Sequence, residues 1–260
     1  MSIELKNVCF SYGERPILKD ISFTVNSGDL IAVLGPNGVG KSTLFSCILG
    51  QKHPSSGSIE ISGKPISHYD KSSLAKEVAY IPQSASPVFS YTVLESVLMG
   101  MTNRLRLFEA PDKSLEDEAF EALESLGIAD LSGRACTQIS GGERQLMLLA
   151  RALVQQAKVL IMDEPTANLD YGNSFRVMQR IMDLGEKGYS VIFSTHEPNQ
   201  AFRYANRVIA LQDGRILADG APNMVLSEKT LGKMYRIGVA VRSADVYGES
   251  YSLSIPYEKK

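Results

Sequence analysis

The sequence predicts an α/β fold organised around a phosphate-binding loop. Two apolar runs, Leu30–Leu34 and Val159–Met162, have the length and composition of buried strands. The first run leads into a glycine-rich stretch that fits the pattern G-x-x-x-x-G-K-S/T, and Ser42–Leu49 reads as the helix that follows it. A strand, a glycine-rich loop and a helix in this order indicate a core that binds a nucleotide.

The phosphate-binding loop is predicted to hold the anionic part of the nucleotide. Its glycines let the backbone bend tightly so that successive N–H groups face phosphate oxygens, and the following helix presents its positive N-terminal end. A lysine adds a positive charge for the outer phosphates, and a serine hydroxyl can ligate magnesium. A chance glycine-rich turn is the alternative, and the flanking strand and helix argue against it. The predicted contact residues are Gly35, Pro36, Asn37, Gly38, Val39, Gly40, Lys41, Ser42 and Thr43.

Size and charge narrow the class of protein. With 260 residues, 44% of them hydrophobic, the chain can bury a substantial core. No apolar run reaches the roughly 18 residues of a membrane span, and Met1–Glu4 lacks the features of a secretion signal, so we expect a cytoplasmic protein. The net charge of -2 gives no support for a nucleic-acid partner. Three widely spaced cysteines argue against disulfides or zinc and are interpreted as small buried residues: Cys9, Cys47 and Cys136.

The first part of the chain predicts antiparallel β structure. Ile3–Phe10 and Ile17–Val25 alternate apolar and polar residues around a polar turn, and a shorter hairpin follows at 58–66. Tyr12 lies at the edge of the first turn. Its ring could stack on a flat base or could instead cover the core, and the residues alone leave both interpretations open.

Gln83 is a candidate for the nucleotide site because of its place after a strand. It follows the short apolar run Val78–Ile81, which Pro82 ends. Open α/β sheets bind ligands at the carboxyl ends of their strands, so we expect Gln83 beside the nucleotide. A loop glutamine that is simply solvated is the alternative.

Residues 84–155 are interpreted as a helical insertion. Ala85–Met101 is so rich in apolar residues that it suggests a partner surface as much as a core. Thr92 is predicted to cap a helix that Gly100 ends. Ser114 is predicted to open the next, acidic amphipathic helix as part of a capping box.

A second anion-binding arrangement is predicted before the helix Gln145–Gln155. Ser140, Gly141 and Gly142 lie at the start of that helix, where backbone N–H groups and the helix dipole favour a phosphate. An ordinary serine N-cap followed by flexible glycines is the alternative.

Two carboxylates follow the apolar run Val159–Met162. A charge at the end of a buried strand must be paired or must bind a metal. Asp163 can hold magnesium through water, and Glu164 can act as the base for an attacking water. A solvated acidic turn is the alternative. The strongly apolar strand before the two carboxylates argues against it.

His196 comes directly after another buried run, Tyr189–Ser194. A lone histidine is more often structural than catalytic. Its position at a strand end, as for Lys41 and Glu164, favours contact with the terminal phosphate. Gln212–Gly214 predicts a hairpin turn, and Gly238–Ile255 predicts a small terminal hairpin.

The motifs described above, and their order along the chain, resemble those of ATP-binding subunits of ABC transporters. The resemblance extends from Ile3 to about Gly220. The signature segment Ser140–Arg144 departs from the commonest pattern at Ile139 and Glu143, and neither change removes the serine or glycine contacts. By resemblance, the motif residues are Tyr12 as the adenine-stacking aromatic, Gly35–Thr43 as Walker A, Gln83 in the Q-loop, Ser140–Arg144 as the signature, Val159–Glu164 as Walker B, Asn168–Asp170 as the D-loop and His196 as the switch histidine.

The resemblance implies a P-loop NTPase core of ABC type over 1–237, with an N-terminal antiparallel β subdomain, a helical insertion, and a C-terminal hairpin at 238–260. It implies ATP and Mg2+ as cofactors, with magnesium held by Ser42, Gln83 and Asp163. The expected partners are a second copy in a head-to-tail dimer, integral membrane permease subunits and, indirectly, a substrate-binding protein. The expected location is the cytoplasmic face of the cell membrane. The residues that this implies for catalysis are Glu164, His196 and Gln83.

A narrower resemblance is to the ATPases of importers of iron-siderophores, haem and cobalamin. It rests on Tyr91–Gly100, on Ile139–Ala152 and on the terminal hairpin after Gly238. The ATPase of an ABC exporter is the nearest competitor. A soluble scaffold-type ABC ATPase, as in iron-sulfur cluster assembly, is the other alternative, against which the apolar stretch after Gln83 argues.

Overall fold

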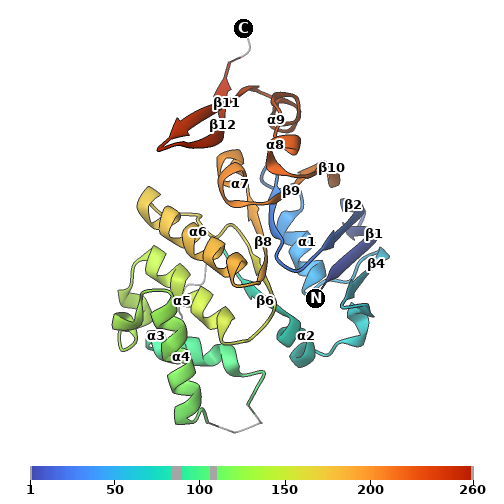
Figure 1. Ribbon diagram of the computed structural model, residues 1–260. Coiled ribbons are helices and arrows are strands. Elements are labelled where there is room, and N and C mark those ends of the chain that lie inside the picture. Colours follow the sequence, from blue (N-terminus) through green and yellow to red (C-terminus); the bar gives the residue numbers. More distant parts are fainter. Residues whose placement is uncertain (1, 84–89, 106–109, 259–260) are drawn as a thin grey trace. The chain divides into compact units, whose positions relative to one another are not determined.

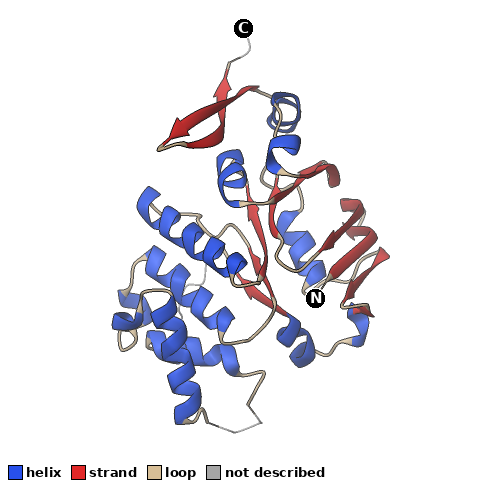
Figure 2. Cartoon of the chain, in the orientation of Figure 1, coloured by secondary structure: helices blue, strands red, loops and turns tan. Residues whose placement is uncertain are grey.

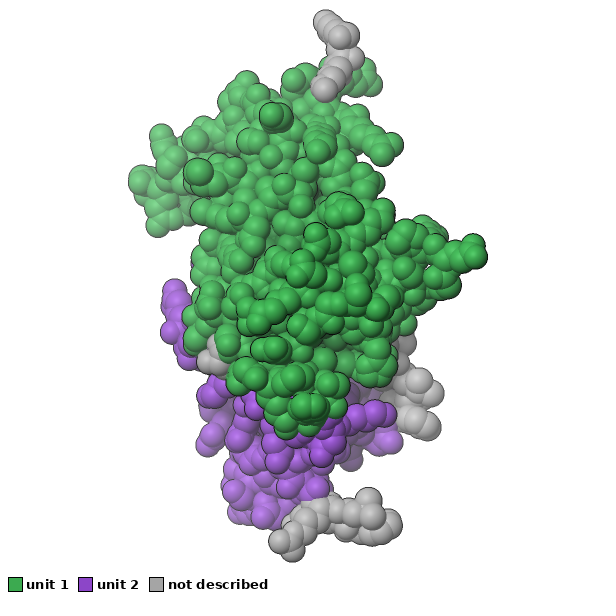
Figure 3. Space-filling model, turned by 90° about the vertical axis from the view of Figure 1, so that its right-hand side faces the viewer, with its two compact units in different colours: residues 1–68, 190–260 green, residues 69–189 purple. Residues whose placement is uncertain are grey.

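The computed structural model describes residues 2–83, 90–105 and 110–258 (Figure 1), with helices and strands interleaved along the chain (Figure 2). These residues form two compact units, coloured separately in Figure 3. Unit 1 comprises Met1–His68 and Ser190–Lys260, and unit 2 comprises Tyr69–Tyr189. The division into a 1–237 domain, with its insertion at 84–155, and a 238–260 tail stays a prediction.

The start of unit 1 is an antiparallel sheet, as the alternating sequence predicts. Its strands lie in the order β2-β1-β4-β5. Apolar residues at alternate positions, such as Ile3 and Leu5, are fully buried or nearly so, because successive side chains of a strand point to opposite faces. The strands are β1 (Ile3–Tyr12), β2 (Arg15–Val25), β4 (Ser56–Ile61) and β5 (Lys64–Pro65), and a 3₁₀ turn, η1, follows at Ile66–His68.

Parallel strands form the core of unit 1. β3 (Leu30–Leu34) lies between β8 (Ser190–Thr195) and β9 (Arg207–Gln212) and is parallel to both. Its last four residues have no exposed surface, which explains the unbroken apolar run in the sequence. The helix α1 (Lys41–Ile48) follows the glycine-rich loop and packs against β2.

The predicted hairpin after β9 is confirmed. β10 (Arg215–Gly220) pairs antiparallel with β9. Asp213 and Gly214 between them have φ angles of 50° and 78°, the left-handed values that a tight two-residue hairpin turn requires.

The C-terminal part of unit 1 ends in the predicted terminal hairpin, whose register runs from Gly238 opposite Tyr257 to Val246 opposite Glu249. Three helices precede it along the chain. The elements are α7 (Pro198–Tyr204), α8 (Pro222–Val225), α9 (Glu228–Tyr235), β11 (Gly238–Val246) and β12 (Glu249–Tyr257).

Unit 2 combines two parallel strands with packed helices. β6 pairs with β7 in a register from Val78 opposite Val159 to Ile81 opposite Met162, so both strands end at the same edge. The helices α3, α4 and α5 pack against one another. The elements are α2 (Lys71–Glu77), β6 (Val78–Ile81), α3 (Val93–Leu98), η2 (Met99–Met101), α4 (Lys113–Ser125), η3 (Ala129–Leu131), η4 (Cys136–Gln138), α5 (Gly141–Leu153), β7 (Val159–Met162) and α6 (Tyr171–Glu186).

The apolar stretch of the insertion divides between core and surface. Val93 and Val97, interpreted from the sequence as exposed, have no exposed surface because they form the inner face of α3. Tyr91 is 42% exposed. Val88 and Phe89 lie outside the described residues.

Two helix boundaries in the insertion differ from prediction. Thr92 caps α3 as predicted, and its capping box with Glu95 is complete. The N-cap of α4 is Asp112, whose carboxylate accepts from Leu115 N at 3.0 Å, so Ser114 lies inside the first turn and does not cap it. α3 ends close to the predicted place, with Met99 as its C-cap, but Gly100 is not a left-handed cap: it lies in η2 against α5, where an added Cβ would meet Arg151 O at 2.1 Å.

The cysteines are all free thiols, and one differs from its predicted burial. Cys47 and Cys136 are buried, and burial raises the pKa of Cys47 to about 11. Cys9, in β1, is only half-buried, and its Sγ accepts from Asp20 N at 3.2 Å.

Candidate functional site

The glycine-rich loop has the backbone geometry that a phosphate cradle needs. Gly38 and Gly40 have φ angles of 79° and 114°, in the region that residues with a side chain rarely adopt. A Cβ on Gly35 would lie 2.8 Å from Leu211 O, so the loop also approaches β9 too closely for a side chain. Gly35 N donates to Thr195 O at 3.3 Å, which ties the start of the loop to the end of β8.

Lys41 places a buried positive charge inside this loop. Its side chain is buried, and its Nζ donates to Gly35 O at 2.8 Å and to Pro36 O at 3.4 Å. An ammonium group is a compact point charge that suits phosphate oxygens. The curved backbone and the enclosed lysine together fit a triphosphate. Ser42, in the first turn of α1, keeps its side chain exposed.

Tyr12 lies at the edge of the β1–β2 hairpin beside this loop. Its ring is 49% exposed and meets the Phe10 ring edge to face, with centroids 5.0 Å apart. Hydrogen bonds with the side chains of Lys52 and Thr43 hold the pKa of Tyr12 below its usual value. Of the two interpretations from sequence, the exposed ring favours stacking on a base, since a core-covering ring would be buried.

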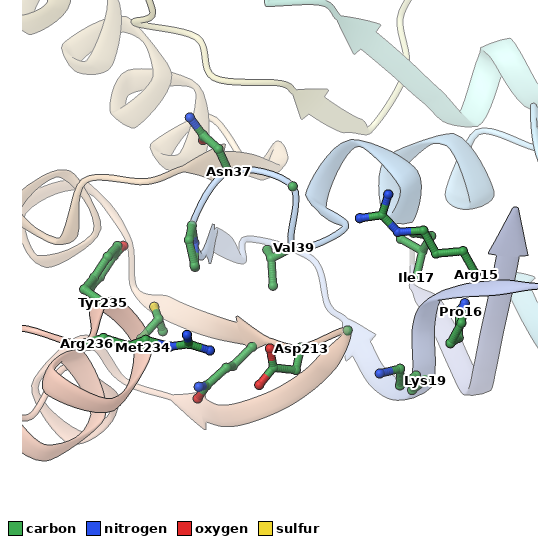
Figure 4. A pocket seen from close by; sticks show the side chains of 14 residues that line it. Arg15, Pro16, Ile17, Lys19, Asn37, Val39, Asp213, Met234, Tyr235 and Arg236 are labelled. Carbon is green, nitrogen blue, oxygen red and sulfur yellow. The ribbon is translucent and has the colours of Figure 1, made fainter.

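A cavity of about 470 Å³ flanks the phosphate loop within unit 1 (Figure 4). Pro36–Val39 form one wall, and Arg15 extends from β2 toward the loop. Lys19, Asp213 and Arg236 also line the cavity, and in Figure 4 Asp213 lies between the two basic residues. Sequence reasoning assigned no role to these basic residues. Arg15 could have been singled out from the sequence, because it is a basic residue close along the chain to Tyr12, the predicted base-stacking aromatic.

His196 is exposed and comes directly after β8, as predicted. The Thr195 hydroxyl fixes the chain around it, because Thr195 Oγ1 accepts from Glu197 N at 3.0 Å and donates to Gln200 Oε1 at 3.0 Å. The histidine thus leaves the strand in a hydrogen-bonded turn within unit 1.

In unit 2, Asp163 is a buried carboxylate at the end of β7. Its backbone N donates to Ile81 O at 3.0 Å, and its charge, together with the larger effect of burial, raises the pKa of the neighbouring Tyr80. Burying a carboxylate costs free energy unless a partner or a cation compensates it. Asp163 and the amide oxygen of Gln83 in unit 2 are oxygen donors, the kind that Mg2+ prefers, and unit 1 offers one of the same kind in the hydroxyl of Ser42.

The donors of unit 2, the Asp163 carboxylate and the Gln83 amide oxygen, are of the kind that binds a magnesium ion together with a nucleotide. Among the residues that the structure describes, no three or more His, Cys, Asp or Glu side chains form a metal-binding group. Magnesium is usually bound through one or two carboxylates plus substrate phosphates, so a site with a single buried carboxylate is consistent with that mode.

Glu164 has a strained backbone and a defined partner. Its φ angle is 45°, which for a residue with a long side chain costs about 1–3 kcal/mol and recurs at functional sites. Gln83 Nε2 donates to Glu164 Oε2 at 3.3 Å. The strands β6 and β7 therefore deliver the predicted Gln83, Asp163 and Glu164 to one edge of unit 2.

Ser140 is the N-cap of α5, as in the alternative interpretation from the sequence. Its hydroxyl accepts from Glu143 N at 3.3 Å, and its own N donates to Glu143 Oε2 at 2.7 Å, so the two residues form a capping box. That backbone hydrogen bond holds the pKa of Glu143 below its usual value. Gly142 packs too closely for a side chain, since a Cβ would lie 2.6 Å from Asn173 Cγ, while Gly141 and Ser140 stay exposed.

Comparison with known proteins decides the family. Residues 18–167 match the family described as ABC transporter. The match spans more than half of the chain. The chain belongs to the ABC transporter family.

Relatives of this ABC transporter protein cover nearly all of it. An uncharacterized ABC transporter ATP-binding protein of Haemophilus influenzae is 39% identical over 91% of the chain and 90% of its own length. The hemin import ATP-binding protein HmuV of Nocardia farcinica is 35% identical over 93% of the chain and 83% of its own length. A solved inward-facing transporter of metal-chelate type is 32% identical, with a TM-score of 0.89, covering 99% of this chain and 98% of that one.

These relatives confirm the predicted ABC fold and make the protein an ATP-hydrolysing ABC transporter ATPase. The N-terminal antiparallel sheet, the helices of the insertion and the terminal hairpin are all present. Within the part of the chain that the structure describes, no helix is both long and apolar enough to span a membrane.

Proposed function

We propose that this ATPase powers the import of an iron-siderophore, haem or cobalamin-like complex. The support is the similarity to a hemin import ATPase and to a transporter of metal-chelate type. The exporter and scaffold-type alternatives are not favoured by these relatives. The protein would act at the cytoplasmic face of the cell membrane, bound to permease subunits that receive their substrate from a substrate-binding protein.

In this proposal two copies of the chain pair head to tail. Each ATP lies between the phosphate loop of one copy and the Ser140–Gly142 segment of the other. The exposed N-terminal turn of α5 supports this, because Ser140 and Gly141 are accessible at a helix start that favours an anion. ATP binding would then close the dimer, and loss of the terminal phosphate would shift the population back to open.

The chain's own residues divide the work of binding. Tyr12 stacks on the adenine, the loop N–H groups hold the phosphates, and Lys41 leaves its carbonyl partners to bind the outer phosphates. Ser42, Gln83 and Asp163 are the residues that would hold Mg2+. When bound, that ion neutralises charge on the phosphates.

The observation that carries the mechanism is the contact of Gln83 with Glu164. Glu164 stands after a buried strand with a left-handed backbone, and the Gln83 amide holds its carboxylate. A carboxylate fixed in this way can accept the proton of an attacking water. Gln83 would report the state of the permease to this base, and His196 would contact the terminal phosphate.

The test is uptake by a reconstituted transporter. The chain is co-expressed with a candidate permease and placed in liposomes with ATP inside and the matching binding protein outside. We expect ATP-dependent accumulation of one substrate among a ferric siderophore, haem and cobalamin, and none with Glu164→Gln. Export of substrate, or the absence of a membrane partner, would contradict the proposal.

A further inference from the structure

The C-terminal segment of the chain contacts the main chain of His196. The hydroxyl of Tyr235, the last residue of α9, donates to His196 O at 2.8 Å. Figure 4 shows Tyr235 beside Met234 and Arg236, on the side of the cavity away from Arg15. A residue far along the chain thus supplies a hydrogen bond to the residue that follows β8.

This bond completes the support of a short stretch of backbone. Thr195 O accepts from Gly35 N of the phosphate loop, and Thr195 Oγ1 accepts from Glu197 N. His196 lies between Thr195 and Glu197, and its carbonyl oxygen accepts the hydrogen bond from the Tyr235 hydroxyl. Because the direction of a side chain follows from its main chain, fixing these peptide groups limits where the His196 ring can point.

Tyr235 is suited to act as a constant donor. Its ring is partly buried, and burial raises its pKa, so the hydroxyl keeps its proton over the range in which proteins work. The following residue, Arg236, has a φ angle of 58° and ends α9 in a left-handed cap, which fixes the end of the helix that carries the tyrosine.

The terminal hairpin is attached to the same region at a second place. Asn199, on the helix that follows His196, accepts from Ser254 N at 2.7 Å and from Ser254 Oγ at 2.9 Å, and donates to Ser254 O at 3.3 Å. The Arg203 guanidinium lies 5.6 Å from the centre of the Tyr251 ring. The C-terminal segment, residues 228–257, therefore contacts the turn and helix around His196 at two places: through Tyr235 at the end of α9, and through Tyr251 and Ser254 in β12.

The hairpin is also attached to α9, so the segment is one connected body. Glu228 accepts from Val241 N at 3.0 Å and from Arg242 Nη1 at 2.8 Å. α9 packs on β11, and α7 packs on β12. A displacement of the hairpin would therefore be passed to both Tyr235 and Asn199.

We propose that Tyr235 is a positioning residue for His196, through which the segment 228–257 orients the histidine for hydrolysis. This inference rests on the proposed contact of His196 with the terminal phosphate. Tyr235 acts through the His196 carbonyl, so it should change the rate of turnover and leave the binding of ATP unchanged.

The test is a double-mutant cycle of Tyr235→Phe and His196→Ala, scored by the kcat and KM of ATP hydrolysis. Tyr235→Phe keeps the ring and removes one hydrogen bond, so we expect a kcat roughly three- to tenfold lower and an unchanged KM. In the His196→Ala background the same change should have no further effect, because the imidazole that Tyr235 is proposed to orient is absent. Tyr251→Phe, which removes a hydroxyl bonded to Glu249 within the hairpin, is the matched control and should keep the wild-type kcat.

The single variants separate the two hypotheses. A wild-type kcat for Tyr235→Phe, or an equal loss in both backgrounds, overturns the role of Tyr235 while that of His196 stands. A wild-type kcat for His196→Ala overturns the proposed function of His196 and this inference with it. All rates are measured well below the melting temperature of every variant, so that a loss of stability cannot imitate the effect.

Discussion

Gln83 and Glu164 are joined by a hydrogen bond of 3.3 Å between the side-chain amide and the carboxylate. The two residues follow β6 and β7, whose last residues Ile81 and Met162 lie opposite each other in the parallel register. The contact is therefore a product of strand register: a shift by one residue would send one of the side chains to the other face. It places the Gln83 amide directly on the carboxylate of the candidate base.

Glu164→Gln should abolish turnover and preserve nucleotide binding. The amide keeps the shape of the side chain but cannot accept a proton from water, so we expect hydrolysis to fall by at least about 100-fold. ATP should trap this variant as a dimer, seen by size-exclusion chromatography with light scattering. Glu186→Gln, at the end of α6, is the charge-matched control. Normal hydrolysis by Glu164→Gln would remove Glu164 from the role of base.

Lys41→Ala should weaken the binding of ATP. The buried ammonium that now contacts two loop carbonyls is the charge available to the outer phosphates. Hydrogen bonds to charged groups contribute about 1.5–3 kcal/mol, so we expect a Kd roughly 10- to 100-fold higher. Calorimetry with a non-hydrolysable ATP analogue and magnesium measures it, with the exposed Lys187→Ala as control. An unchanged affinity would mean that the loop does not hold phosphate through this lysine.

The parts of the fold that the sequence predicts well are those with a local cause. The apolar runs Leu30–Leu34 and Val159–Met162 became β3 and β7, because strands buried on both faces need continuous apolar residues. The turn at Asp213 and Gly214 followed from the residues that tolerate positive φ. These features depend on a few neighbouring residues, so pattern reasoning is sufficient for them.

The parts that were missed have a non-local cause. Apolar residues that cover a core and those that face a partner have the same composition, so Val93 and Val97 could not be distinguished from Tyr91. Asp112 and Ser114 are both good caps, and only the tertiary start of α4 selects between them. The contact of Tyr235 with His196 depends on how the elements between them along the chain pack together, and no spacing of residues in the sequence predicts it.

Gly100→Ala should destabilise the protein because of close packing and not because of helix termination. An added Cβ would meet the backbone oxygen of Arg151, which cannot move aside as a flexible side chain would. We expect a loss of roughly 1–3 kcal/mol in the free energy of unfolding, measured by denaturant titration. Gly133→Ala is the matched control, since nothing lies within 4 Å of its added Cβ. Equal stability of the two variants would contradict the packing explanation.

The capping box at the start of α5 predicts a pH dependence. The Ser140 N–H bond lowers the pKa of Glu143 in the folded protein below its ordinary value of 4.5. A depressed carboxyl pKa contributes stability that is present above the ordinary value and is lost as the pH falls through the folded value. Glu143→Gln should therefore melt below the wild type near about pH 7, and the difference should narrow as the pH falls below 4.5. A difference that is constant with pH would show that the charge does not stabilise the helix start.

Tyr91→Asp should uncouple the ATPase from its permease. The Tyr91 side chain is 42% exposed at the start of the insertion, whereas its backbone O accepts from Cys136 N at 2.8 Å. The substitution changes the exposed side chain and leaves that backbone bond in place, so basal hydrolysis and the melting temperature should stay close to wild type. An aromatic anchor at an interface can contribute about 2 kcal/mol or more to binding, so co-purification with the permease should be lost.

The control for this prediction is the same substitution at a tyrosine outside the apolar stretch Ala85–Met101, which the sequence suggests as a partner surface. Tyr247 is fully exposed in the turn of the terminal hairpin, and Tyr247→Asp introduces the same charge there. An acidic residue tolerates the left-handed backbone of that turn, so the fold should not oppose it. If Tyr91→Asp and Tyr247→Asp both assemble with the permease and support uptake, the membrane subunit does not dock at Tyr91. If both fail, a general effect of the negative charge is the better explanation.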